Sequence, residues 1–366
     1  MDSKLTIHVV GARPNFVKLA VVFPTLSRYF NQLIIHTGQH YDYELSRIFF
    51  KHFDIPEPNY YLGVGSGSHG YQVGEMIKRV EKILLKERPD IVVVYGDTNS
   101  TLAGALAAVK AGFKVAHVEA GLRSYDLRMP EEVNRRVVDH ISHVLFAPTS
   151  SAVNNLREES VMGEVYLVGD VHVDVLRRWL PIAEARSDIL DRLGLEPKDY
   201  VLVTVHRAEN TDNLERLRRI VDILIDVSKR SFVVFPIHPR TRKALERIGL
   251  LRVLESVKDL MLVKPLGYLD FIKLLKYSRI VVTDSGGVQR EAYLLHVPCL
   301  VLRDRTEWCE LAGKGYVIVV DLDKDKILRC IEEEPKLMFE DGLLGDGRAG
   351  ERIARILYEY ISKVKE

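Results

Sequence analysis

The residues best suited to hold a ligand follow a valine-rich run in the second half of the chain, at 280–283. This run leads into Asp284-Ser285-Gly286-Gly287 and then into a helix-like segment. Because glycine has no Cβ, a ligand can approach bare backbone there, and the free N–H groups of a helix N-terminus favour an anion. Glu291, about one turn further on, could hold hydroxyl groups but would repel a phosphate. The pattern predicts a ligand with an anionic and a hydroxyl-rich part, such as a nucleotide.

Six other strand-like runs also end in charged, histidine or glycine residues. They end in Gly11-Ala12-Arg13-Pro14-Asn15 with Lys18 one turn on, Gly38-Gln39-His40, Gly96-Asp97-Thr98, Glu119-Ala120-Gly121-Leu122-Arg123, His206-Arg207 and His238-Pro239-Arg240. In open parallel sheets, ligands bind beyond the carboxyl ends of the strands. If two domains face each other through these ends, all of these groups line one cleft.

Structural roles compete with this interpretation for each group taken alone. Arg13 and Lys18 could be surface charges, and Asp97-Thr98 could cap the next helix. An acidic residue such as Glu131 is expected in the first turn of a helix from the dipole alone. Glu119 directly follows a buried strand, where a carboxylate needs a partner or a function.

The patterns that resemble metal sites have simpler explanations. Asp321-Leu322-Asp323 matches the DxD of some glycosyltransferases, but helix capping explains it. His117 and Glu119 lack a third ligand in the sequence, and His238 could bind an anion or cap the helix that follows. No metal is expected.

The elements that position these groups alternate between strands and helices along the whole chain. Continuous apolar strands between helices indicate parallel sheets covered on both faces, and two such sets indicate an α/β protein with two Rossmann-like, doubly wound domains. Strands are expected at 5–10, 33–37, 91–95, 115–118 and 144–147, and again at 200–205, 232–237, 260–263, 280–283, 299–302 and 317–320. Helices are expected from about residue 15 and at 43–50, 101–111, 131–142, 214–229 and 348–365.

The bulk properties fit this organisation. A length of 366 residues suits two domains, which we place at 1–180 and 181–347, with 348–366 as a helix packing back on the first domain. The net charge of +1 argues against a nucleic-acid binder, and three cysteines without a CxxC pair predict neither disulfides nor zinc. We find no signal peptide and no run long enough to span a membrane. A reduced, cytoplasmic protein is expected.

In combination and in this order, the motifs resemble the non-hydrolysing UDP-N-acetylglucosamine 2-epimerases, from Arg13 to about Glu310. The resemblance rests on Gly11-Ala12-Arg13-Pro14 with Lys18, Gly96-Asp97-Thr98, His117-Val118-Glu119-Ala120-Gly121-Leu122-Arg123, Pro130-Glu131-Glu132 with Asn134-Arg135, His206-Arg207, and Asp284-Ser285-Gly286-Gly287 with Glu291. It implies the GT-B architecture, two domains facing across a cleft, and reversible interconversion of UDP-N-acetylglucosamine and UDP-N-acetylmannosamine. It also implies a homodimer and no cofactor.

The resemblance also implies roles for individual residues. Ser285, Gly286 and Gly287 would hold phosphate, Glu291 the ribose and Phe271 the uracil. The groups facing the sugar and diphosphate would be Arg13, Lys18, Asp97, Glu119, Glu131, Arg135 and His206, with Asp97, Glu119, Glu131 and His206 catalytic. Similar bacterial enzymes bind a second, activating nucleotide sugar, and parts of that site match Gln39, Arg207 and His238.

Three features depart from the family pattern. Trp308 stands where many relatives have an arginine, Leu266 replaces a glutamine, and the loop at 124–129 is shorter than in some bacterial members. These departures concern nucleotide contacts and the activator more than the reaction.

The expected chemistry follows from the weak acidity of the C2 hydrogen of the sugar. Departure of UDP creates an oxocarbenium-like C1, which acidifies C2 and allows elimination to a glycal; UDP then adds back. Cationic groups and glycine amides would stabilise the leaving diphosphate, and clustered carboxylates would move the proton. Three alternatives stay open: a GT-B glycosyltransferase, a hydrolysing epimerase and a catalytically silent nucleotide-sugar sensor.

Overall fold

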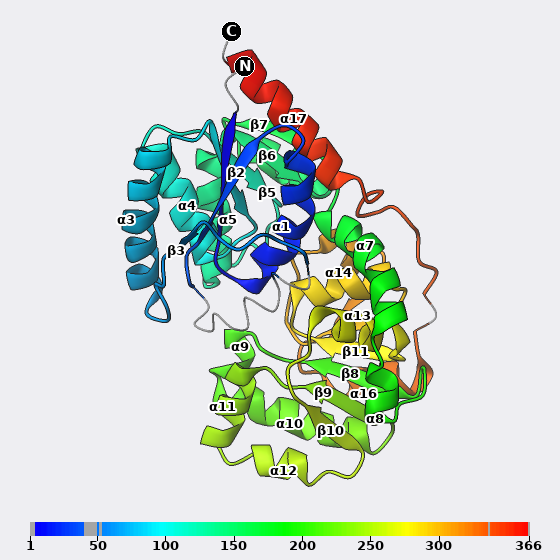
Figure 1. Cartoon of the computed structure of the whole chain (residues 1–366). Coiled ribbons are helices and arrows are strands. Elements are labelled where there is room, and N and C mark those ends of the chain that lie inside the picture. The colour runs from blue at the N-terminus through cyan, green and yellow to red at the C-terminus, as the bar shows by residue number, and fades with distance from the viewer. Residues whose placement is uncertain (1–3, 40–49, 51–52, 336, 365–366) are drawn as a thin grey trace. The chain divides into compact units, whose positions relative to one another are not determined.

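The chain forms two compact units in the computed structural model, which describes residues 4–39, 50, 53–335 and 337–364. The first unit comprises residues 1–177 and 342–366, and the second comprises residues 178–341. Each unit is a parallel β-sheet with helices on both faces (Figure 1). A parallel sheet covered on both faces requires strands that are apolar throughout. Strand β4 (Ile91–Tyr95), for example, is buried at every position.

The first unit contains a seven-stranded sheet in the order β3-β2-β1-β4-β5-β6-β7. Its strands are β1 (Leu5–Val10), β2 (Asn31–His36), β3 (Tyr60–Tyr61), β4, β5 (Val115–Val118), β6 (Val144–Ala147) and β7 (Glu164–Leu167). Its helices are α1 (Arg13–Leu26), α3 (His69–Glu87), α4 (Asn99–Lys110), α5 (Pro130–Ile141), α6 (Ser150–Glu158) and α17 (Ala349–Val364). Helices α3, α4 and α5 lie side by side, and α17 lies along α1 (Figure 1).

The second unit contains a six-stranded sheet in the order β10-β9-β8-β11-β12-β13. Its strands are β8 (Tyr200–Thr204), β9 (Phe232–Pro236), β10 (Leu260–Val263), β11 (Ile280–Thr283), β12 (Cys299–Val301) and β13 (Val317–Val319). Its helices are α8 (Ile189–Leu193), α9 (Ala208–Thr211), α10 (Leu214–Ser228), α11 (Pro239–Arg247), α12 (Leu251–Glu255), α13 (Tyr268–Tyr277), α14 (Gly286–Leu294), α15 (Cys309–Gly313) and α16 (Lys324–Glu333). Helix α7 (Val171–Arg186) runs from the first unit into the second.

Both sheets reverse their strand order at one point, where a crevice for ligands is expected. The reversal lies between β1 and β4 in the first sheet and between β8 and β11 in the second. The neighbouring pairs are in register, with Val9 beside Val94 and Thr283 beside Thr204. The turns after β1, β4, β8 and β11, which lie at these two points, carry predicted site residues, and Gln39, Glu119 and His238 follow the neighbouring strands β2, β5 and β9.

The predicted strands are present, and the first sheet contains two more strands that were not predicted, one of them after residues 144–147. Strand β7 pairs with β6 beyond them, and the two-residue strand β3 pairs with β2 at the other edge. Helix α1 begins at Arg13, two residues before the predicted start. The helix predicted at 43–50 lies, except for Phe50, outside the described residues. Within the described part of the chain, no helix has the length and apolar character needed to cross a membrane.

Candidate active site

The centre of the first unit's strand-end cluster is an ion pair between Lys18 and Glu119. The Lys18 Nζ lies 3.0 Å from Glu119 Oε1, and the two side chains are only 2% and 8% exposed. The pair lies against Gly96, where an added Cβ would lie 3.0 Å from Lys18 Nζ and 3.3 Å from Glu119 Oε1. Gly96 also has a φ of +63°, so both space and backbone conformation require glycine there.

The turn after β1 is held by a side chain that the sequence did not identify as functional. Asn15 Oδ1 accepts hydrogen bonds from the backbone N–H groups of Gly11 and Ala12, at 3.2 and 3.1 Å. Asn15 Nδ2 donates to the carbonyl of Tyr95, at 2.8 Å. Asn15 thus ties the end of β1 to the end of β4 and fixes where α1, with Lys18, begins.

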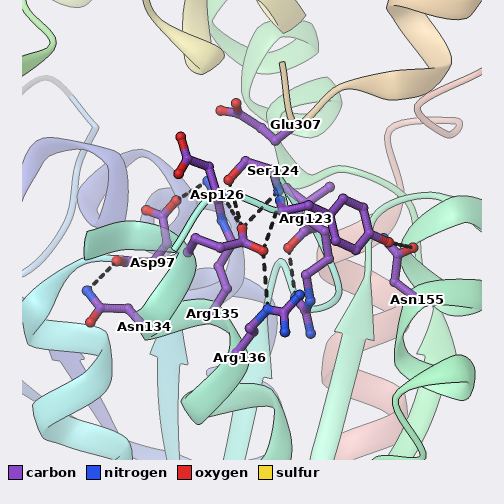
Figure 2. A network of polar contacts seen from close by, with 12 residues as sticks. Asp97, Arg123, Ser124, Asp126, Asn134, Arg135, Arg136, Asn155 and Glu307 are labelled. Atoms are coloured by element: carbon purple, nitrogen blue, oxygen red, sulfur yellow. Dashed lines mark hydrogen bonds and ion pairs between the residues drawn. The ribbon is translucent and has the colours of Figure 1, made fainter. Parts of the chain in front are cut away.

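Asp97 follows β4 and is held by helix α5. Arg135 NH2 lies 2.6 Å from Asp97 Oδ2, and Asn134 Nδ2 donates to the Asp97 carbonyl at 2.8 Å (Figure 2). The other side of Arg135 contacts the buried carboxylate of Glu132 at 3.1 Å. Arg135 is 3% exposed, and its two carboxylate partners show that it orients Asp97, a role that its prediction as a substrate-binding residue did not include.

Glu132 organises the loop that leads into α5. Its carboxylate accepts hydrogen bonds from the backbone N–H groups of Ser124 and Tyr125, at 2.8 and 3.2 Å, and from the Ser124 hydroxyl at 3.0 Å. Figure 2 shows this loop beside Arg135 and Arg136. The sequence indicated Glu131 as the functional member of this acidic pair, and the adjacent Glu132 is the one that fixes the loop.

A second buried network lies beneath the turns that carry Asp97 and Glu119. The Asp139 carboxylate contacts His117 Nδ1 at 2.7 Å, Arg123 NH1 at 2.7 Å and the Gly121 N–H at 3.0 Å. Burial by itself would raise the pKa of Asp139, but the hydrogen bond and charge of His117, together with Arg123, lower it overall. Asp139 is on α5, far from His117 in sequence, so only the fold reveals the pair.

The remaining predicted residues of the first unit lie at the same strand ends. Arg13 is the first residue of α1, and Glu131 is in the first turn of α5; both are half-buried. Gln39, after β2, accepts hydrogen bonds from the Ser100 N–H and hydroxyl, at 2.9 and 2.6 Å. The structure thus brings Lys18, Glu119, Asp97 and Arg135 into direct ion pairs and places Arg13, Gln39 and Glu131 on the neighbouring turns.

In the second unit, Asp284 builds the turn after β8. Its buried carboxylate accepts hydrogen bonds from the backbone N–H groups of His206 and Arg207, at 3.0 and 2.9 Å, and from Asn210 Nδ2 at 3.1 Å. The His206 Nδ1 lies 3.4 Å from Asp284 Oδ1. The ring of His238 lies 5.4 Å from that of His206, and His238 caps α11 through the Arg240 N–H.

The glycine turn at the start of α14 packs against the side chains of Glu307 and Trp308. An added Cβ on Gly286 would lie 2.1 Å from Glu307 Oε1 and 3.4 Å from Trp308 Nε1, whereas at Gly287 the nearest atom, Ser285 Oγ, is 3.7 Å away. Glu307 is held by Arg303 at 2.9 Å, and the guanidinium of Arg290 lies over the Trp308 ring. Gly286 is therefore required by the protein's own packing, whereas the packing would tolerate a Cβ at Gly287.

The other residues expected to hold a nucleotide are on the two helices of this region. Ser285 is the N-cap residue of α14, and its side chain makes no capping hydrogen bond. Glu291, further along α14, is 7% exposed. Phe271 is in the first turn of α13, and Leu266 lies in the loop before that helix; both are half-buried.

One cluster in the described part of the chain could supply three metal ligands, from Glu119, Asp170 and His172, whose ligand atoms lie within 4.8 Å of one another. The Asp170 carboxylate accepts a hydrogen bond from the His172 N–H at 2.9 Å. The ammonium of Lys18 would repel a divalent ion bound to Glu119. The geometry therefore favours an ion-pair cluster over a metal centre. In the Asp321-Leu322-Asp323 segment, Asp323 caps α16 through the Lys326 N–H, as predicted.

Comparison with known proteins identifies similar sequences along nearly the whole chain. The sequence profile of the family described as UDP-N-acetylglucosamine 2-epimerase matches residues 25–358. A Methanococcus maripaludis protein named UDP-N-acetylglucosamine 2-epimerase homolog is 49% identical over 353 residues, covering 96% of this chain and 98% of that protein. A Pseudomonas aeruginosa protein named UDP-2,3-diacetamido-2,3-dideoxy-D-glucuronate 2-epimerase is 42% identical, covering 98% of this chain and 99% of that protein.

A solved structure extends the likeness to the fold. The crystal structure of Methanocaldococcus jannaschii UDP-GlcNAc 2-epimerase in complex with UDP-GlcNAc and UDP superposes with a TM-score of 0.92 at 44% identity. The match covers 97% of this chain and 99% of that chain. The predicted GT-B fold class is confirmed, and the chain belongs to the UDP-N-acetylglucosamine 2-epimerase family.

Proposed function

We propose that the protein is a non-hydrolysing isomerase that interconverts UDP-N-acetylglucosamine and UDP-N-acetylmannosamine. The observation that carries the proposal is the division of labour between the two sheets. One switch point presents the carboxylates Asp97 and Glu119, each paired with a cation. The other presents a glycine-rich helix start suited to a diphosphate. The crystal structure of the M. jannaschii relative with UDP-GlcNAc and UDP supports this substrate class.

The reaction proceeds by elimination and re-addition. The C1–O bond breaks with its electron pair going to the β-phosphate of UDP, a carboxylate takes the C2 proton, and the C1–C2 double bond of a glycal forms. A proton is then delivered to C2 from the opposite face, and UDP attacks C1 again. No net oxidation or hydrolysis occurs, so the reaction is reversible.

The proposed roles are those that the family resemblance implies, and the chemistry of each group supports them. Arg13, Lys18 and His206, with the amides of Gly286 and Gly287, stabilise the leaving diphosphate. Asp97, Glu119 and Glu131 stabilise the positive charge at C1 and move the proton. Ser285 binds phosphate, Glu291 the ribose hydroxyls and Phe271 the uracil.

The decisive experiment is incubation with UDP-N-acetylglucosamine in D2O, followed by NMR of the sugar. The proposal predicts UDP-N-acetylmannosamine with deuterium at C2 and no accumulation of free UDP. Free UDP with free N-acetylmannosamine would identify a hydrolysing epimerase. UDP release only with an added acceptor would identify a glycosyltransferase, and an unchanged spectrum would leave a nucleotide-sugar sensor.

Substrate choice is tested in the same assay. The P. aeruginosa relative is named for a diacetamido glucuronate, so UDP-2,3-diacetamido-2,3-dideoxyglucuronate is the matched competitor. We expect a higher kcat/KM for UDP-N-acetylglucosamine. A higher kcat/KM for the glucuronate would transfer the proposal to that substrate while keeping the reaction class.

We further propose a homodimer that works in the cytoplasm, and a second nucleotide-sugar site involving Gln39, Arg207 and His238. The family resemblance supports the dimer and the second site. The three cysteines, all free thiols, are consistent with a reducing compartment. Light scattering tests the dimer, and sigmoidal dependence of rate on UDP-N-acetylglucosamine tests the second site.

A further inference from the structure

The hydrogen bonds of His117 determine its protonation state. His117 is on β5 and has no exposed surface. Its Nδ1 lies 2.7 Å from Asp139 Oδ1, and its Nε2 lies 2.7 Å from the Gly96 carbonyl oxygen. A carbonyl and an ionised carboxylate can only accept hydrogen bonds. Both ring nitrogens must therefore donate, which makes the ring a buried imidazolium.

The surrounding charges balance this cation. Asp139 lies between His117 and Arg123, and Arg123 makes two hydrogen bonds with Glu159, at 2.9 and 2.7 Å. The cations His117 and Arg123 therefore face the carboxylates Asp139 and Glu159. Arg136 NH2 also lies 3.9 Å from Glu159 Oε1, so the buried charges are paired. The guanidinium 2.7 Å from Asp139 Oδ2 keeps that carboxyl ionised and leaves it an acceptor for His117.

A second buried histidine in the same sheet provides a contrast. His8, on β1, lies 2.6 Å from the Tyr95 hydroxyl through Nδ1 and 2.8 Å from Gln32 Oε1 through Nε2. The hydroxyl can donate to Nδ1, so one ring proton satisfies both contacts. Burial, only partly opposed by the Gln32 hydrogen bond, lowers the pKa of His8 to about 4. His8 is therefore neutral in an environment as buried as that of His117.

The His117 network connects the two turns that carry the proposed carboxylates. The Gly96 carbonyl that His117 binds directly precedes Asp97. Asp139, its other partner, accepts from the Gly121 N–H, two residues after Glu119. Glu119 itself has a φ of +73°, a left-handed conformation that a glutamate adopts only when its surroundings impose it.

We propose that His117, as an imidazolium, is a positioning residue that fixes the Asp97 turn relative to the Glu119 turn. Its two donated hydrogen bonds reach one turn directly and the other through Asp139. The inference rests on the proposed function, in which both carboxylates act on the same sugar. Both hydrogen bonds of His117 go to protein groups, so it acts through the carboxylates it positions.

Two substitutions separate the two hydrogen bonds. His117→Asn places an amide nitrogen near the position of Nδ1 and can still donate to Asp139, whereas His117→Gln places one near Nε2 and can still donate to Gly96. Neither carries the charge. We expect both to lower kcat by about 10–100-fold, the usual cost of losing a residue that orients a reacting group, with a much smaller change in KM. The rates are normalised to the fraction of protein that binds UDP by calorimetry.

His8→Asn is the matched control, because it removes a buried, doubly hydrogen-bonded histidine of the same sheet. We expect a similar loss in melting temperature and a kcat close to that of the unmodified protein. The positioning role would be overturned if the His117 variants kept the kcat of the unmodified protein per molecule that binds UDP. It would also be overturned if His8→Asn lowered kcat as much as the His117 variants do.

The protonation state is measured independently by long-range proton–nitrogen NMR of the unmodified protein near neutral pH. The signal that disappears in His117→Gln should show a proton on both ring nitrogens, and the His8 signal a proton on one. A neutral His117 ring would overturn the inference. This NMR measurement does not depend on turnover. A negative result in the D2O experiment would therefore refute the proposed function and leave the protonation state of His117 unaffected.

Discussion

The ionised side chains of the first unit are held in fixed pairs before any ligand arrives. Lys18 and Glu119 form a pair that is almost fully buried, and burying two charges costs free energy that their attraction only partly offsets. Asp97 is fixed in the same manner by Arg135. Such pairs are weak evidence of stability, and their position after neighbouring strands is consistent with the proposed role of the two carboxylates.

Asp97→Asn should retain UDP binding and lose most turnover, because Arg135 keeps its contact with Glu132 while the proton-transferring group is gone. We expect kcat to fall by about 10²–10⁴-fold, the range for a general acid or base. Glu75→Gln is the control, since it removes a carboxylate from another arginine pair, Glu75 and Arg79 at 2.9 Å on α3. Asp97→Asn with kcat similar to the control would remove Asp97 from the mechanism.

Among the elements, the start of α14 contains two adjacent glycines with different roles. Gly286 is required by packing, and Gly287 is the one proposed to face the ligand. An added Cβ at Gly286 would clash with Glu307, whereas one at Gly287 would make only an ordinary contact with Ser285 Oγ, although both glycines belong to one motif in the sequence. The first glycine lets the Arg303–Glu307 pair pack against the start of the helix, whereas the second has room for a Cβ. Adding a methyl group at each position should therefore have different consequences.

Gly286→Ala should destabilise the second unit by about 1–3 kcal/mol, the typical cost of overpacking, because its Cβ would lie 2.1 Å from Glu307 Oε1. Gly287→Ala should leave the melting temperature nearly unchanged and weaken UDP binding. Calorimetric unfolding and titration with UDP measure the two effects. Equal losses of stability in both variants would contradict this assignment.

The elements also show what the sequence could predict. Continuously apolar strands such as β4 and β11 were predicted with their observed bounds, because burial on both faces leaves a clear signal. Strand β7 was missed since it is a sheet-edge strand with exposed or half-buried residues throughout. The start of α1 was misplaced because Asn15, which already lies inside the helix, accepts hydrogen bonds from Gly11 and Ala12, the two residues before the helix.

The sequence predicted the motifs of the candidate site, and it did not predict which side chains pair with the site residues. Asp97, Glu119 and the glycine turn follow strands, so their position marked them as candidates, and the family resemblance implied their roles. His117 was considered only as a metal ligand, because its partner Asp139 is 22 residues away on another element. Likewise, the pairing of Arg135 with Asp97 depends on how α5 packs.

At the scale of the whole molecule, the chain crosses between the units twice. Helix α7 leads out of the first unit, and residues 342–366 return to it. Helix α17 then packs on α1 and buries Ile353, Leu357 and Ile361. Asp174 receives the first backbone N–H groups of α17, from Ala349 and Gly350 at 3.2 and 3.0 Å.

Truncation after Arg348 should therefore unfold the first unit while leaving the second intact. Burial of each large aliphatic side chain contributes about 1.5–3 kcal/mol, so three of them approach the total stability of a domain, about 5–15 kcal/mol. Calorimetry should lose one of two transitions, and UDP titration should still detect the second unit. A truncated chain with both transitions at their original temperatures would contradict this view.

The return of α17 to the first unit has a consequence for biosynthesis. A ribosome releases residues 178–341 before residues 342–366, so the second unit can complete its sheet while the first still lacks a helix. Domains generally fold as units as they emerge. We therefore expect the unit proposed to hold the nucleotide to complete its fold first, and the unit that carries Asp97 and Glu119 to complete its fold only after residues 342–366 have been synthesised.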